Sequence, residues 1–198
     1  MGVLIAVIVI AVVVLIIVAF LWTSYNGLAR ARIRVKEAWS GIDVQLRRRS
    51  SLIPNLVETV KGYAAHEKET LDAVTRARAQ LDTARQSGSA AATAQADNIL
   101  TGTLRSLFAV SEAYPDLKAN TNFLELQREL TDTEDKIAYS RQFYNANVSD
   151  YNQRTAVFPT LIIAGMFGFK PEEFYEAEES AREEVQVSFS SGTPTTSG

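Results

Sequence analysis

The chain has 198 residues, a formal net charge of −3, no cysteine and a single histidine, His66. A chain without cysteine has no disulfide framework, and one histidine leaves too few residues for most metal sites and catalytic dyads. The acidic balance and the lack of a recognisable nucleic-acid-binding module argue against a nucleic-acid partner. We therefore expect a protein that is not an enzyme and that holds no cofactor or metal.

An uncharged apolar run occupies residues 3–22, and sixteen of these twenty residues are Val, Ile, Leu or Phe. As a helix the run would measure ~30 Å, which is the thickness of the hydrocarbon core of a bilayer. At roughly −0.4 kcal/mol for each of these residues, insertion is favourable by about 6 kcal/mol. A cleaved signal peptide is the alternative, but it has a shorter apolar core and a positively charged start. The sequence predicts a single transmembrane anchor over residues 1–24.

The residues that follow the run predict how the anchor is oriented. No charged side chain precedes the run, whereas four basic residues follow it closely. Because positive residues stay on the cytoplasmic side, we expect the N-terminus outside and the C-terminal domain on the cytoplasmic side of the cell (inner) membrane. The predicted membrane interface combines aromatic and basic side chains: Trp22, Tyr25, Arg30, Arg32, Arg34 and Lys36.

Residues 25–184 have the periodicity of a helical bundle. Apolar side chains recur at spacings of three and four residues, which is the pattern of one face of a helix. Short links between such helices favour antiparallel neighbours. The predicted fold is all-α, an anchor followed by an antiparallel four-helix bundle with long helices, and the tail 185–198 is predicted to be flexible. The expected helices are 25–50, 52–86, 94–113 and 122–158, with a short acidic helix at 171–184.

Three boundaries rest on particular residues. The apolar stripe slips in phase around residues 50–54, where Ser51 is a suitable N-cap and Pro54 fits the first turn of a new helix. We therefore predict a reversal there, with a single kinked helix as the alternative, because stutters also slip the phase. Residues 86–93 are small and polar and predict a linker. Asn122 is the expected N-cap of the last long helix.

Side chains on the predicted helical faces are assigned to the core or to an interaction surface. Trp39 lies on the same stripe as Ile42 and Leu46, which favours a core position over a partner-binding one. Arg49 also lies on this stripe, so the seam between the helices is not purely apolar. The full assignment to the core or to an interaction comprises Trp39, Pro54, Tyr144, Tyr151 and Phe158.

The segment 159–169 is strongly apolar but too short to span a bilayer as a helix. It is expected to pack onto its own bundle, with another subunit or lipid as the alternative contact. Four antiparallel helices would return Phe158 to the level of Tyr25, so we expect this segment at the membrane-proximal end. The acidic residues 171–184 are expected to turn away from anionic lipid.

Several ordered motifs resemble those of the LemA family of bacterial membrane proteins. They are YNGL at 25–28, WSGIDVQL at 39–46, LIPNLV at 52–57, VKGYA at 60–64, YPDLKAN at 114–120, RQFYN at 141–145 and YN at 151–152. One departure is Ser51, where an Asp before Leu-Ile-Pro would be usual, and either residue can cap a helix. The resemblance implies a single-pass anchor with its N-terminus outside, a helical bundle inside and no catalytic residues to carry over.

These features predict a membrane-anchored scaffold or adaptor that is not an enzyme. A lipid-binding or membrane-shaping protein is the alternative, and an unrecognised enzyme using scattered carboxylates is the least supported reading. The expected partners are the lipid bilayer, further copies of the chain through the anchor or the bundle, and other membrane proteins.

Overall fold

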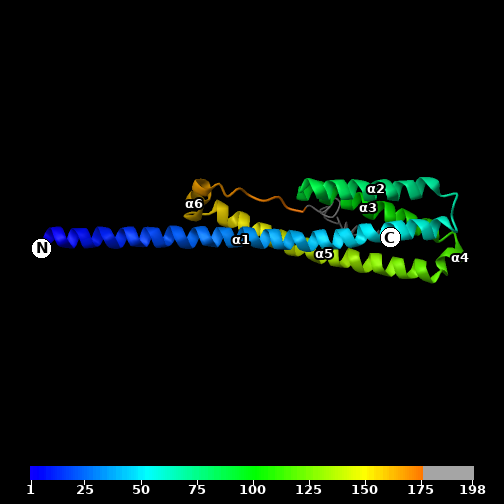
Figure 1. Ribbon diagram of the computed structural model, residues 1–198, viewed down its shortest axis with the longest axis horizontal. Coiled ribbons are helices and arrows are strands. Elements are labelled where there is room, and N and C mark those ends of the chain that lie inside the picture. The colour runs from blue at the N-terminus through cyan, green and yellow to red at the C-terminus, as the bar shows by residue number, and fades with distance from the viewer. Residues whose placement is uncertain (176–198) are drawn as a thin grey trace, which may run out of the picture.

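The computed structural model describes residues 1–175, and these residues form six helices and no strand. The chain order is α1 (Gly2–Lys61), α2 (Lys68–Ser87), α3 (Ala90–Ser111), α4 (Pro115–Lys118), α5 (Thr121–Ala156) and α6 (Thr160–Phe167) (Figure 1). α1 pairs most extensively with α5, and α2 with α3, while α1 also packs against α2. The protein is therefore all-α, an antiparallel bundle of four long helices with an apolar N-terminal extension, as the sequence predicts.

α1 is one continuous helix that extends from the apolar run into the bundle. Its 60 residues correspond to a length of about 90 Å. Residues 3–18 expose their side chains, and the first buried residue of α1 is Leu28. Figure 1 shows this N-terminal part projecting beyond the bundle. Of the helices in residues 1–175, α1 alone is long and apolar enough to cross a membrane.

The predicted reversal at Ser51 is wrong, because α1 continues through Pro54 to Lys61. A proline inside a helix costs ~3 kcal/mol, since it removes one backbone hydrogen bond. Ile53 just before the proline, and Leu56 and Val60 beyond it, are fully buried. Each such side chain contributes about 1.5–3 kcal/mol when removed from water, so continuing the helix outweighs the penalty.

Two polar residues explain the apparent phase slip of the apolar stripe in α1. The buried positions of α1 continue without interruption when Arg49 and Ser50 are included as members. Both side chains are polar, and a sequence reading that follows apolar residues alone loses the phase there. The expected helices 25–50 and 52–86 are therefore replaced by α1 and the shorter α2.

The first reversal of the chain lies at residues 62–67. The N–H groups of Tyr63 and Ala64 donate to the carbonyl of Val60 at 3.0 and 2.8 Å, which closes the end of α1. The hydroxyl of Tyr114 donates to Glu67 Oε1 at 2.8 Å and ties this turn to the end of α3. The turn thus depends on contacts between segments far apart in the sequence.

The predicted linker 86–93 shrinks to Gly88 and Ser89. Gly88 has a φ of 75°, a left-handed conformation that glycine adopts without strain. Ser89 caps α3, because its side chain accepts a hydrogen bond from the N–H of Ala92 at 3.2 Å. The alanines that suggested a linker form the first turn of α3 instead, since alanine has the highest helix propensity.

α5 follows the turn that contains α4, and its length agrees with the prediction. Asn120, and not Asn122, is its N-cap, because the Asn120 side chain accepts from the N–H of Phe123 at 3.0 Å. Both asparagines satisfy the capping preference, and the burial of Phe123 selects the earlier one. α5 ends at Ala156, two residues before the predicted Phe158.

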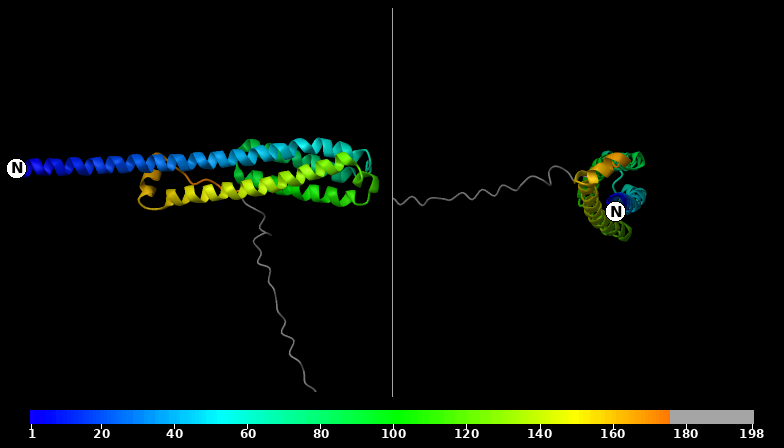
Figure 2. Two further views of the ribbon diagram at one scale, coloured as in Figure 1. Left: turned by 90° about the horizontal axis from the view of Figure 1, so that it is seen from below. Right: turned by 90° about the vertical axis from the view of Figure 1, so that its left-hand side faces the viewer.

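α6 lies at the end of the bundle from which the N-terminal part of α1 projects (Figure 2). It packs against both α1 and α5. The rings of Tyr25 and Phe167 are 4.9 Å apart between centroids. The prediction that residues 159–169 return to the level of Tyr25 is confirmed; we call this the membrane-proximal end because it adjoins the apolar run. The first reversal lies at residues 62–67 and not at Ser51, but the bundle still has four long helices. The last of them, α5, therefore still runs back to the end of the bundle near Tyr25.

Residues 170–175 run back along α5 as an extended segment. The Asn152 side chain donates to the carbonyl of Glu172 and accepts from its N–H, both at 2.9 Å. Asn145 forms the same pair of bonds with the backbone of Tyr175, at 2.9 and 2.8 Å. The expected acidic helix is thus wrong for residues 171–175, because these asparagines bind the backbone groups that a helix would use. The rest of that helix and the tail 185–198 lie outside the described residues.

Candidate functional site

Charged side chains are buried at the centre of the bundle. Asp97 has an exposed fraction of 0%, and its Oδ1 accepts from Arg49 Nη1 at 2.8 Å. Its Oδ2 accepts from Arg141 and from the hydroxyl of Tyr175, the latter at 3.0 Å. Arg49 Nη2 lies 2.8 Å from Glu134 Oε2. We call these residues the polar cluster: Arg49 of α1, Asp97 of α3, Glu134 and Arg141 of α5, and Tyr175.

The electrostatics of the polar cluster are balanced, since two guanidinium groups face two carboxylates. Burial is the largest single influence on the pKa of Arg141 and would lower it, but the charge and hydrogen bond of Asp97, together with Tyr175 and Glu134, outweigh burial and raise that pKa. Burial raises the pKa of Tyr175, and the negative charge of Asp97 raises it further. The Arg141 guanidinium also lies over the Tyr175 ring, 4.9 Å from its centroid. Tyr175 therefore stays a neutral hydrogen-bond donor.

This chemistry suits a structural clamp. Both oxygens of Asp97 are occupied, so neither is free to act as a base. The cluster joins α1, α3 and α5 to the extended segment 170–175. Within residues 1–175, no group of three His, Cys, Asp or Glu side chains is arranged to hold a metal ion.

A second polar network joins α1 to α2. Arg85 donates to Asp43 at 2.9 Å and to Asp82 at 3.1 Å. The Ser50 hydroxyl lies 3.0 Å from the carboxylate of Asp82, and Arg78 donates to the same hydroxyl at 3.2 Å. These charge-assisted bonds fix the register of the two helices.

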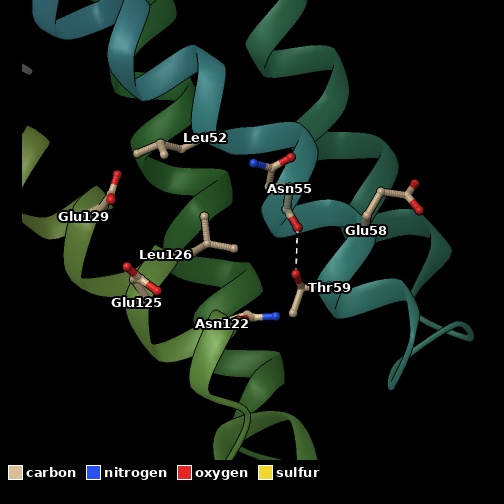
Figure 3. Close-up of a pocket in the computed structure, with 8 residues that line it drawn as sticks. All are labelled: Leu52, Asn55, Glu58, Thr59, Asn122, Glu125, Leu126 and Glu129. Atoms are coloured by element: carbon tan, nitrogen blue, oxygen red, sulfur yellow. Dashed lines mark hydrogen bonds between the residues drawn. The ribbon is translucent and has the colours of Figure 1, made fainter.

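An open groove lies between α1 and α5 near the end of the bundle that is distant from the apolar run. Its volume is about 480 Å³. We call it the distal groove; Figure 3 shows the residues that line it, Leu52, Asn55, Glu58 and Thr59 from α1 and Asn122, Glu125, Leu126 and Glu129 from α5.

The distal groove combines two leucines with three carboxylates. The hydroxyl of Thr59 is turned to its own helix, where it donates to the Asn55 carbonyl at 2.8 Å. Of the three glutamates, Glu129 lies 3.8 Å from Arg48 and Glu58 lies 3.5 Å from Lys61, and both are weak surface pairings. An apolar strip with an acidic border is complementary to an amphipathic segment that carries basic residues.

The membrane-proximal end has a different chemistry. Phe167 of α6 lines a cavity of about 360 Å³ together with Val18, Leu21, Trp22, Tyr25 and Asn26 of α1. Asn26 is the one polar residue among these six. A further cavity of about 220 Å³ is lined by Thr23 and Ser24 of α1 together with Arg154 and Thr160.

The comparison with protein families shows the family to which this chain belongs. A family model described as the LemA family matches residues 38–189. This chain belongs to the LemA family. Protein LemA of Metamycoplasma hominis is 28% identical over 165 residues, which cover 82% of this chain and 74% of that protein. Magnetosome protein MamQ of Magnetospirillum gryphiswaldense is 27% identical over 185 residues, which cover 80% of this chain and 68% of that protein. Together with the apolar N-terminal helix, membership makes this a membrane-associated protein.

In this LemA-family chain the predicted interface residues divide into two groups. Trp22 is 72% exposed beside the cavity, and the Tyr25 ring contacts Phe167 and Phe169. The basic residues fall into a second group, in which two of the four face carboxylates of the bundle. Arg32 pairs with Glu172 at 3.2 Å and Arg34 with Asp150 at 3.0 Å, and the sequence predicts neither ion pair. Arg30 and Lys36 form no ion pair within residues 1–175.

The residues predicted for the core or an interaction also divide. Tyr144 and Tyr151 are buried, and their hydroxyls donate to the carbonyls of Glu173 and Lys170 at 2.8 and 2.9 Å. Trp39 is half-buried, and its ring lies 5.5 Å from that of Tyr144. Pro54 lies inside α1. Phe158 is 75% exposed, so it does not belong to the core of the described chain.

Sequence reasoning missed most of the polar cluster. Arg49 carried a signal, because a charged residue on an apolar stripe needs a buried partner. Asp97 and Arg141 carried none, since their pairing depends on how α3 and α5 are placed around α1. Tyr175 lies among glutamates, where the sequence predicts a short acidic helix.

Proposed function

We propose that this LemA-family protein is a non-enzymatic scaffold, anchored in the membrane by its N-terminal helix, which holds a protein-binding groove at a fixed distance from the bilayer on the cytoplasmic side. The observation that carries the proposal is the distal groove, with Leu52 and Leu126 beside three glutamates. Its expected occupant is an amphipathic segment with basic residues, from another membrane protein or a further copy of the chain.

The reach of the scaffold follows from the continuity of α1. Asn55 in the groove lies 33 residues after Trp22 on the same helix, which corresponds to ~50 Å. The polar cluster and the Asp43–Arg85 network stiffen the helices between these two levels. The distal groove is thus held away from the lipid headgroups, at a level where it is accessible to protein partners.

Two further observations support this function. The basic residues that follow the apolar run favour a cytoplasmic domain. Each carboxylate of the polar cluster pairs with a guanidinium group, Asp97 with Arg49 and Arg141 and Glu134 with Arg49. The relatives carry the names LemA and magnetosome protein MamQ, neither of which names a reaction.

Photo-crosslinking in native membranes tests the groove. A photoreactive residue at Leu126 of the full-length protein should give discrete crosslinked products, whereas the same residue at Leu124, an exposed position on the same helix, should not. Glu125→Lys should reduce the Leu126 products at least fivefold. Asp135→Lys, an identical charge change on an exposed part of α5, should leave them unchanged. Equal products from both positions, or products insensitive to Glu125→Lys, would refute the proposal.

Orientation is tested separately with a cysteine at Tyr139, which is 72% exposed in a chain without native cysteine. A membrane-impermeant maleimide should label it only after permeabilisation of the cells. Labelling in intact cells would place the bundle outside.

A further inference from the structure

The hairpin that follows α5 exposes apolar side chains without interruption by charge. We call residues 155–169 the apolar hairpin; it is bounded by Arg154 and Lys170 and contains no charged residue. Within it, Ile163 and Ala164 are buried against Leu28. Six larger apolar side chains remain half to three-quarters exposed: Val157, Phe158, Leu161, Ile162, Met166 and Phe167. An exposed apolar patch of this kind marks a contact with another apolar phase or molecule.

The apolar hairpin lies at the depth where α1 leaves the predicted membrane span. Phe167 shares the 360 Å³ cavity with Val18, Leu21 and Trp22, which belong to the last turns of the apolar run. Figure 2 shows α6 beside α1 at this level. Leu21 of the apolar run packs against the cluster that contains Ile163 and Ala164 of α6. If residues 3–22 span a bilayer, α6 therefore lies close to the bilayer surface.

The backbone of the apolar hairpin suits a poorly hydrated environment, in which unpaired polar groups are costly. The Thr160 hydroxyl lies 2.6 Å from the carbonyl of Arg154 and 2.9 Å from that of Val157. At the other end, Gly168 ends α6 in a left-handed conformation, and the N–H of Phe169 donates to the Ala164 carbonyl at 2.9 Å. These bonds pair carbonyl groups at the end of α5 and the Ala164 carbonyl of α6 within the chain.

We propose that the apolar hairpin is a second membrane-contacting element, in which α6 lies in the boundary between headgroups and acyl chains. α6 has 8 residues, or ~12 Å, so it lies along the interface and does not span it. Lys170 flanks it where anionic headgroups would meet it, and so does Arg154, which also pairs with Asp150 at 2.9 Å. The bilayer is favoured over a second copy of the chain, because the patch continues the lipid-facing surface of α1. This proposal concerns the opposite end of the bundle from the distal groove and does not depend on it.

Fluorescent labels on single cysteines test the proposal in the full-length protein. The probe is an environment-sensitive dye at Ile162 or Met166, with Leu124 and Tyr139 as exposed control positions distant from α6. The protein is reconstituted in vesicles of phosphatidylcholine and phosphatidylglycerol. Nitroxide on the lipid should quench the Ile162 and Met166 labels at least threefold more than the controls, and aqueous iodide should quench them at least threefold less.

The remaining outcomes contradict the proposal. Quenching by iodide equal to that of the controls would place α6 in water. Protection from both quenchers would mean that protein covers the patch. Lipid quenching that falls as the protein-to-lipid ratio rises tenfold would assign the patch to a second copy of the chain. Unchanged helical circular dichroism confirms that each labelled variant is folded, which these surface positions permit.

Discussion

The polar cluster and the apolar hairpin invert the usual distribution of residues, with charges inside the bundle and apolar side chains outside it. In the polar cluster every ion meets an opposite charge or a hydrogen-bond donor from the same chain. The apolar hairpin has no such internal partner for its six exposed side chains. The charged groups of the cluster pair with one another inside the chain, although the Nε atoms of Arg49 and Arg141 have no hydrogen-bond partner in the described part of the chain. The apolar side chains of the hairpin are covered by the bilayer that we propose.

The largest effect is expected where the polar cluster loses its central charge. Asp97→Ala leaves Arg49 and Arg141 close together without the carboxylate that separates them. Removing one partner of a buried ion pair costs about 3–5 kcal/mol in the free energy of unfolding. Denaturant unfolding of the detergent-solubilised protein measures this loss. Asp135→Ala, at an exposed position of α5, should change stability by less than about 0.5 kcal/mol. Equal stability of the two variants would mean that the cluster does not hold the bundle together.

A smaller effect is expected at the edge of the cluster. The Trp39 ring lies 5.5 Å from Tyr144 and 6.2 Å from Tyr175, but it is only half-buried. A fully enclosed Trp→Ala change costs about 3–5 kcal/mol, so we expect Trp39→Ala to cost roughly 2 kcal/mol. A loss near zero, with crosslinking partners lost as well, would identify Trp39 as an interface residue.

Alkaline pH should weaken the contact of the extended segment 170–175 with α5, in which the Tyr144 hydroxyl donates to the Glu173 carbonyl. Burial and the charges of Glu172 and Glu173 raise the pKa of Tyr144 to about 12. Because the folded state holds this proton more tightly than the unfolded state, stability is full below pH ~10 and falls as the pH rises toward the folded pKa. Unfolding midpoints between pH 9 and 12 should therefore decline less steeply in Tyr144→Phe than in the unaltered protein. Tyr139→Phe, at an exposed position, should show the unaltered slope, and a shallower slope there would contradict the assignment.

The smallest effect on stability is expected in the apolar hairpin. Ile162 is 54% exposed, so Ile162→Ser removes little buried surface and should change the free energy of unfolding in detergent by less than about 0.5 kcal/mol. In the same variant, lipid quenching of a label at Met166 should fall. A large loss of stability would show that Ile162 belongs to the core of the bundle.

The sequence predicted those parts of the fold that depend on local periodicity. The apolar run, the four-helix path and α5 follow from regular stripes and from an apolar composition. The position of the first reversal did not, because Arg49 and Ser50 are polar members of a buried stripe and Pro54 resembles a helix start. Whether a proline ends a helix is decided by the burial on both sides of it, which a local pattern does not contain.

The sites were harder to predict than the helices. Asp97 meets Arg49 and Arg141 across 48 and 44 residues of sequence, so their pairing is a property of the packed bundle. The distal groove forms where α1 and α5 meet, and none of its glutamates stands out in a chain with many carboxylates. The apolar hairpin was visible as a composition, but its exposure could be read only from the structure.

The central claim, that the protein acts as a scaffold through its distal groove, is tested most directly by the mass of the complex extracted from native membranes in a mild detergent. The account predicts a discrete species heavier than one chain, which Glu125→Lys dissociates and which Asp135→Lys leaves intact. A single chain carrying only detergent and lipid, or a complex with the same mass in both variants, would contradict it.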